Sequence, residues 1–82
     1  MFEIKWEKRA LKELFKLEKI VASRIYKKIG TLVYGFQSKD VKRIKGENTF
    51  GLRIGNYRII FSLENNKIII WKLGYRKNIY KK

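Results

Sequence analysis

The chain of 82 residues contains 21 Lys or Arg against 7 Asp or Glu, so its formal net charge is +14 at pH 7. It contains no Cys and no His, which excludes disulfides, thiolate nucleophiles, Ser-His-Asp triads and Cys/His metal sites. The length predicts one domain spanning residues 1–82. We expect no metal and no small-molecule cofactor. The charge predicts an electric field that attracts nucleic acid or an acidic protein.

The N-terminus lacks the basic start and long apolar stretch of a secretory signal. No apolar run approaches the ~20 residues that a membrane span needs. The basic residues are also spread along the chain rather than gathered on one face of one helix, as a membrane-surface helix requires. We therefore expect a cytoplasmic protein with no membrane partner.

Residues 2–6 alternate apolar and charged side chains, which predicts a half-buried strand. From Glu7 to about Phe36 the apolar residues recur at spacings of three and four, which predicts helix. One unbroken helix of that length would run ~45 Å, whereas a compact domain of this size is only ~30 Å across. We expect a break at Leu17 to Lys19 and two antiparallel helices.

Residues 41–46 form a strongly basic segment between a polar loop and Gly46, and we interpret them as a loop. With the preceding lysine, the cations of this region are Lys39, Lys42, Arg43 and Lys45. Such a cluster is usually a solvated surface. It becomes a functional candidate only if the fold brings it next to Arg53 and Arg58.

Three apolar runs follow, separated by two pairs of residues that tolerate positive φ, which predicts a three-stranded antiparallel meander. The runs are Phe50 to Ile54, Tyr57 to Leu63 and Lys67 to Leu73, and the turns are Gly55-Asn56 and Asn65-Asn66. Two-residue turns fix the register, so that Ile54 faces Tyr57, Arg53 faces Arg58 and Glu64 faces Lys67. The strand of residues 2–6 could join either edge of this meander.

Strict alternation assigns each side chain of the meander to one of two faces. The core face carries Phe50, Leu52, Ile54, Tyr57, Ile59, Phe61, Leu63, Ile68 and Ile70, with Lys72 as its one charge. The other face, called the arginine face below, carries Gly51, Arg53, Arg58, Ile60, Ser62, Ile69, Trp71 and Leu73. We expect both helices to pack on the core face, giving an α+β fold.

Arginines directly opposite each other repel, which leaves two interpretations of Arg53 and Arg58. An anion bound between them would relieve the repulsion, or both side chains could splay into solvent. The tail after Leu73 interleaves basic and aromatic residues, as single-stranded nucleic-acid binding requires, but the same pattern fits a frayed basic terminus.

The most distinctive segments are Arg9-Ala10-Leu11-Lys12-Glu13, Lys16-Leu17, Ile44-Lys45-Gly46, Leu52-Arg53-Ile54-Gly55-Asn56-Tyr57-Arg58-Ile59-Ile60-Phe61, and Gly74-Tyr75-Arg76 with Tyr80. Together they resemble the RelE/ParE superfamily of toxins. The resemblance implies a compact α+β toxin that is neutralised by an antitoxin. Its RelE branch cuts mRNA in the ribosomal A site without a metal, using the RNA 2′-hydroxyl as the nucleophile.

The resemblance also implies roles for individual residues. Arg58 and Arg76 would bind the scissile phosphate. Tyr80 would stack on or orient the substrate and assist proton transfer. Lys45 occupies the basic position before the loop glycine, and Arg53 occupies a basic position of the preceding strand, where it would contact RNA.

The neighbouring cations Lys42, Arg43 and Lys77 are further candidates for RNA binding. Gly51 departs from the pattern, because the RelE branch carries a second lysine there. This departure leaves the general base open between Lys45 and Tyr80.

Three functions remain open from the sequence. They are a ribosome-dependent mRNA endonuclease, a ParE-like inhibitor of DNA gyrase that cuts nothing, and a non-catalytic RNA- or ribosome-binding relative. The apolar residues expected on the arginine face are Ile60, Ile69, Trp71 and Leu73. An acidic, amphipathic antitoxin segment is expected to cover them, or Phe2, Trp6 or the C-terminal tail folds over them.

Overall fold

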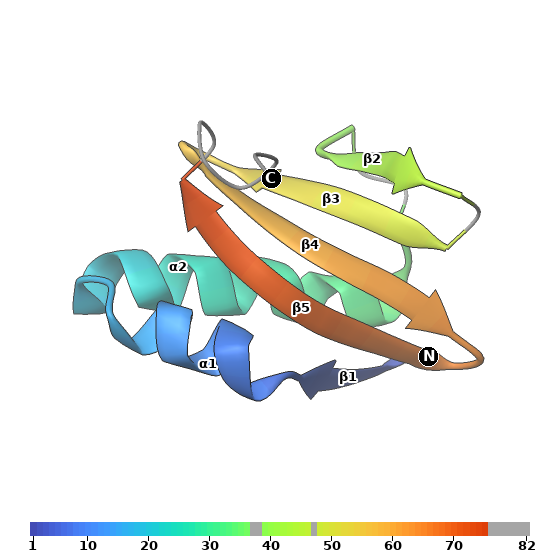
Figure 1. The fold of residues 1–82 in the computed structure, drawn as a ribbon, viewed down its shortest axis with the longest axis horizontal. Coiled ribbons are helices and arrows are strands. Elements are labelled where there is room, and N and C mark those ends of the chain that lie inside the picture. Colours follow the sequence, from blue (N-terminus) through green and yellow to red (C-terminus); the bar gives the residue numbers. More distant parts are fainter. Residues whose placement is uncertain (37–38, 47, 76–82) are drawn as a thin grey trace.

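The computed structural model describes residues 1–36, 39–46 and 48–75. In chain order its elements are β1 (Glu3–Trp6), α1 (Lys8–Phe15), α2 (Lys19–Gly30), the 3-10 helix η1 (Thr31–Tyr34), β2 (Val41–Lys45), β3 (Thr49–Ile54), β4 (Tyr57–Glu64) and β5 (Lys67–Tyr75). The strands form one sheet in the order β1-β5-β4-β3-β2, and α1 and α2 lie on one of its faces (Figure 1). The predicted α+β class is confirmed.

The basic segment is strand β2, so its interpretation as a loop was wrong. Val41 lies opposite Leu52 and Lys42 opposite Gly51, antiparallel to β3, before an irregularity between Arg43 and Lys45. Its charged sequence carries no strand pattern, but lysines and arginines are well suited to an edge strand because they discourage pairing with another chain. The meander therefore has four strands.

Strand β1 occupies the opposite edge and runs parallel to β5, with Ile4 opposite Ile68 and Trp6 opposite Ile70. The sequence left this choice of edge open. The Asn66 side chain in the β4–β5 turn donates a hydrogen bond to the carbonyl of Met1, 2.9 Å away, and thereby ties the start of the chain to that edge.

The helical segment breaks at the predicted place, Leu17 to Lys19. Helix α1 ends at Phe15 and α2 begins at Lys19. The carboxylate of Glu13 accepts a hydrogen bond of 2.9 Å from the Leu73 amide, which fixes α1 against β5. Among the described residues, no helix is long and apolar enough to cross a membrane.

The core lies between the helices and the sheet. Its buried residues are Ala10, Leu14, Ile25, Ile29 and Leu32 from the helical segments and Leu52, Ile54, Ile59, Phe61, Ile68, Ile70 and Leu73 from the sheet. At one end Phe36 packs against Phe2, Phe50 and Phe61, with ring centroids 5.2–5.3 Å apart. This aromatic cluster joins the chain before β1 and the chain after η1 to strands β3 and β4.

A bulge in β5 changes the predicted faces. Ile60 lies opposite Lys72 and Phe61 opposite Ile70, so Trp71 is an extra residue without a partner on β4. The alternation therefore inverts after Ile70, and Leu73 is buried in the core opposite Ile59, at 1% exposure. The placement of Leu73 on the arginine face and Lys72 on the core face was wrong.

Candidate nucleic-acid interface

The arginine face is organised around the pair that the turn residues predicted. Arg53 of β3 lies directly opposite Arg58 of β4, and Arg58 lies opposite Gly74 of β5. Arg58 is half-buried and donates a 3.1 Å hydrogen bond to the carbonyl of Tyr57, whereas Arg53 is exposed. The predicted register is confirmed, and two cations of different exposure lie side by side on this face.

A cavity of about 510 Å³ connects this pair to the basic strand β2. We call it the sheet cavity; its lining is Lys39, Asp40, Lys42, Arg43, Ile44, Gly51, Arg53 and Arg58. The basic segment was a functional candidate only if the fold brought it next to Arg53 and Arg58, and the fold does so. Converging cations on a concave surface favour an anionic ligand.

Lys42 occupies a special position in this cavity. It lies directly opposite Gly51, the position at which the resemblance implies a second lysine. Since residues that pair on adjacent strands share one face of the sheet, β2 brings a cation beside a site on β3 that has no side chain.

Arg43 contributes differently. It lies opposite Phe50, and its guanidinium carbon is 5.9 Å from the centre of the Phe50 ring, within cation–π range. Its register places it on the helix-covered side of the sheet, although it also lines the sheet cavity. Lys45 lies opposite Thr49, and its side chain is outside the described part of the structure. The candidates Arg76, Lys77 and Tyr80 are also outside the described residues.

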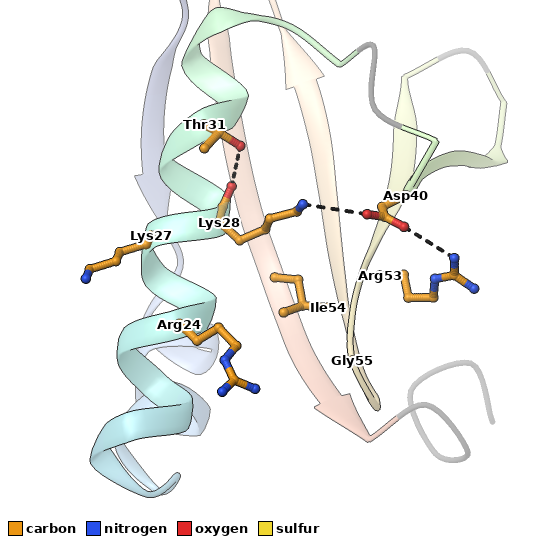
Figure 2. A pocket seen from close by; sticks show the side chains of 8 residues that line it. All are labelled: Arg24, Lys27, Lys28, Thr31, Asp40, Arg53, Ile54 and Gly55. Atoms are coloured by element: carbon orange, nitrogen blue, oxygen red, sulfur yellow. Dashed lines mark hydrogen bonds and ion pairs between the residues drawn. The ribbon is translucent and has the colours of Figure 1, made fainter.

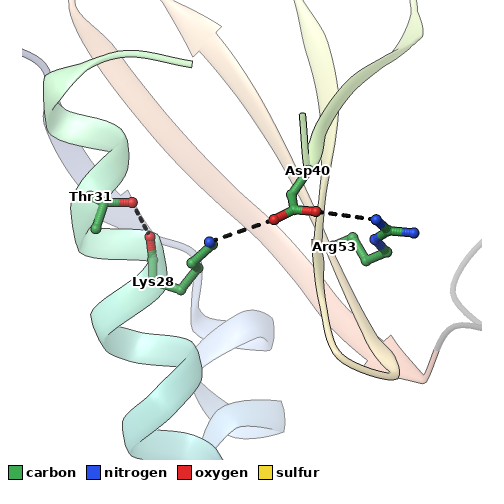
Figure 3. Close-up of polar contacts among 4 residues, drawn as sticks. All are labelled: Lys28, Thr31, Asp40 and Arg53. Carbon is green, nitrogen blue, oxygen red and sulfur yellow. Dashed lines mark hydrogen bonds and ion pairs between the residues drawn. The ribbon is translucent and has the colours of Figure 1, made fainter. Parts of the chain in front are cut away.

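Asp40, immediately before β2, was missed by the sequence reasoning. Its Oδ1 accepts a 3.3 Å hydrogen bond from Nη2 of Arg53, and its Oδ2 lies 3.6 Å from Nζ of Lys28 in α2 (Figure 3). The Arg53 amide also donates to the Asp40 carbonyl, at 2.9 Å. A carboxylate of the protein itself thus holds Arg53. Neither interpretation drawn from the sequence, side chains splayed into solvent or an anion bound between the arginines, included this ion pair. No local pattern signals it, because the partner is 13 residues away along the chain.

Partial burial disfavours the charged form of Asp40, but hydrogen bonding to Arg53 and the charges of Lys28 and Arg53 outweigh it, so its pKa lies below the ordinary value of 3.8. The ionised carboxylate therefore stabilises the folded state. This contribution is fully present above the unfolded pKa and is lost as the pH falls through the lower folded pKa.

We expect Asp40→Asn to lower the free energy of unfolding at neutral pH, because the amide cannot form the two ion pairs. The difference from the wild type should shrink as the pH falls below 3.8 and vanish below the folded pKa of Asp40. Urea unfolding of both proteins from neutral pH to about pH 2 would measure it. A difference that stays constant over that range would contradict the ion pairs as its cause.

The apolar part of the arginine face is smaller than predicted, since Leu73 belongs to the core. Ile69 is 8% exposed and Trp71 42% exposed, and the Trp71 indole donates a 2.8 Å hydrogen bond to the Ser62 hydroxyl. Phe2 and Trp6 do not cover this patch. Trp6 stacks on Tyr26 of α2, 5.9 Å between ring centroids, and Phe2 stacks on Phe36, so both lie on the helix side.

Comparison with known proteins shows the family to which the chain belongs. The model of the family described as ParE toxin of the type II toxin-antitoxin system, parDE, matches residues 4–80. The chain belongs to this toxin family. A curated relative, Toxin RelE3 of Methanocaldococcus jannaschii, is 43% identical over 42 residues; this match covers 50% of the chain and 48%, about half, of RelE3.

Solved RelE structures share the fold of this family member. The RelE–RelB complex of Pyrococcus horikoshii OT3 matches with a TM-score of 0.81 and 27% identity, over 94% of this chain and 97% of that one. The RelB–RelE complex of Methanococcus jannaschii matches with a TM-score of 0.75 and 30% identity, over 92% and 93%. The isolated E. coli RelE toxin matches with a TM-score of 0.78 at 18% identity, over 92% and 84%, which shows a common fold. The predicted RelE-like fold is confirmed.

Proposed function

We propose that the protein is the toxin of a RelBE-type pair and that it cuts mRNA in the ribosomal A site without a metal. The observation that carries this proposal is the sheet cavity, in which Arg53 and Arg58 stand opposite each other beside Lys42. A site of this kind is suited to a reaction in which negative charge grows on a phosphate.

The reaction requires little covalent chemistry from the protein. The RNA 2′-hydroxyl attacks the adjacent phosphorus and loses its proton, the bond to the 5′-oxygen breaks, and that oxygen takes up a proton. The products are a 2′,3′-cyclic phosphate and a 5′-hydroxyl. Arg58 and Arg76 bind the scissile phosphate, and Lys45 or Tyr80 transfers a proton. Lys42 supplies the positive charge that Gly51 cannot, from the neighbouring strand.

Arg53 and the remaining cations of the interface, Arg43 and Lys77, hold the flanking RNA. Phosphate contacts of this kind position a strand without reading its sequence. In the free protein Arg53 is bound to Asp40, so a phosphate beside Arg58 competes with this carboxylate for the guanidinium.

The proposed partner is an antitoxin with an acidic, amphipathic segment. The RelE structures from Pyrococcus horikoshii and Methanococcus jannaschii are complexes with RelB, which supports an antitoxin here. The segment would place apolar side chains on Trp71 and Ile60 and carboxylates near Arg58, thereby closing the sheet cavity.

Primer extension on a defined mRNA tests this function. We expect cuts within codons when the mRNA is programmed on ribosomes, and no cuts in free mRNA. Cuts in free mRNA of equal strength would contradict ribosome dependence. RNA binding without any cut product would favour a non-catalytic relative instead.

A second candidate, inhibition of DNA gyrase, is favoured by the ParE family match. It uses no chemistry at the arginine pair. Supercoiling by purified gyrase distinguishes the two functions, because a ribosome-dependent nuclease should leave it unchanged. Inhibition that persists in Arg58→Ala would favour the ParE-like function.

A further inference from the structure

A second basic cavity lies between helix α2 and the end of β3. It has a volume of about 510 Å³, and its cations come from two elements: Arg24, Lys27 and Lys28 from α2 and Arg53 from β3. We call it the helix cavity. Figure 2 shows Arg24 extending from α2 toward the sheet, whereas Lys27 extends away from it. Ile54 and Gly55 form its apolar side.

The charges of the helix cavity are unbalanced. Four cations line it against one lining carboxylate, Asp40. Among the described residues Asp40 pairs with Lys28 and Arg53, and no described carboxylate forms an ion pair with Arg24. The exposed Arg24 therefore presents a full positive charge to the cavity.

The helix cavity adjoins the proposed catalytic surface, since Asp40 and Arg53 line both cavities. A polyanion with regularly spaced charges can therefore reach from the helix cavity to the sheet cavity across Asp40 and Arg53. A single small anion would have no reason to occupy both, whereas a phosphodiester backbone has a charge at every residue.

We propose that the helix cavity binds a phosphate of the RNA backbone, with Arg24 as its main contact. This inference rests on the proposed function, which makes RNA the ligand. The phosphate belongs either to the mRNA strand whose neighbouring phosphate lies at Arg58 or to a folded RNA that presents two phosphates at this edge.

Charge reversal of Arg24 tests the proposal against a matched control. A labelled single-stranded RNA is titrated with the wild type, Arg24→Glu and Lys12→Glu, and fluorescence anisotropy is recorded at several salt concentrations. Lys12 is exposed on α1 and lines a separate, lysine-rich cavity of about 400 Å³ that also contains Glu13. Because both variants replace a cation by Glu, they change the net charge equally.

We expect Arg24→Glu to weaken binding about tenfold and to lower the slope of log K against log salt by about 0.7, the value for one phosphate contact on a single strand. Lys12→Glu should weaken binding by less than about twofold, and Arg24→Lys should retain most of the affinity. Equal losses in the two reversal variants would overturn the proposal, because they would show general electrostatic attraction. Circular dichroism confirms that each variant is folded.

Two further arms separate the sources of the phosphate and the two proposals. An effect of Arg24→Glu on the single strand assigns the phosphate to mRNA, and an effect on an RNA hairpin alone assigns it to a folded RNA; no effect on either overturns the proposal. Arg58→Ala should lower the rate of cutting by about 10²–10³-fold but keep the Arg24-dependent binding. If the wild type cuts no mRNA on ribosomes while Arg24→Glu still weakens RNA binding, the catalytic function fails and the helix cavity stands.

Discussion

Arg58→Ala is expected to lower the rate of ribosome-dependent mRNA cleavage by about 10²–10³-fold, the loss seen when one preorganised donor to a developing anion is removed. Arg58 has this weight because it is half-buried between Arg53 and Gly74, where its hydrogen bond to the Tyr57 carbonyl holds the guanidinium in place. A fixed donor needs no reorganisation when charge develops on the phosphate. Cleavage rates on programmed ribosomes, from primer extension at several times, measure the loss.

The fold should survive this change. Arg58 lies outside the hydrophobic core, and its removal also ends the like-charge contact with Arg53. We expect the thermal midpoint to shift by no more than about 5 °C, as for loss of about 1 kcal/mol in a domain of this size. Arg9→Ala is the matched control, because Arg9 is an exposed arginine of α1 that pairs with Glu13, and it should cleave at the wild-type rate. A folded Arg58→Ala protein within tenfold of the wild-type rate would contradict the assigned role.

Arg58→Lys refines the same test. Lysine keeps the charge but lacks the planar fork that contacts two phosphate oxygens at once. A partial loss, smaller than that of the alanine variant, is expected if Arg58 binds the scissile phosphate directly. Equal activity of lysine and arginine would indicate that charge alone matters at this position.

The meander and its register followed from the sequence because turn chemistry is local. Gly55 and Asn65 adopt φ of 58°, as two-residue hairpin turns require, and the pairs Arg53–Arg58 and Glu64–Lys67 then follow by counting. The end of the first helix was predictable for a different reason, the size of a compact domain. Both arguments use only nearby residues and general dimensions.

The elements that sequence reasoning missed depend on partners far along the chain. Strand β2 has no apolar alternation, and only its pairing with β3 makes it a strand. Asp40 looked like part of a polar loop, yet it bridges Lys28 and Arg53. The cations of the basic interface were therefore predictable from the sequence, whereas their assembly into a cavity and its internal carboxylate were not.

The bulge at Trp71 exchanges the faces on which strict alternation would place Lys72 and Leu73. Alternation would place Lys72 in the core and leave Leu73 on the arginine face, whereas the bulge buries Leu73 opposite Ile59 and places Lys72 opposite Ile60. We expect Leu73→Ala to lower the free energy of unfolding by about 2–5 kcal/mol. Lys72→Ala should change it by no more than about 0.5 kcal/mol.

Urea unfolding of both variants measures this contrast, and the slope of the unfolding free energy against urea should stay the same if the native and unfolded states keep their exposed areas. Deletion of Trp71 provides the independent control, because it removes the extra residue and leaves a regular ladder in which Lys72 still lies opposite Ile60 and Leu73 opposite Ile59. This deletion is expected to cost less stability than Leu73→Ala, since Leu73 stays in the core. Equal tolerance of Leu73→Ala and Lys72→Ala would contradict the bulge. The bulge matters for function, since it determines that Lys72 and the exposed Trp71, rather than Leu73, border the arginine face on which RNA and the antitoxin are proposed to bind.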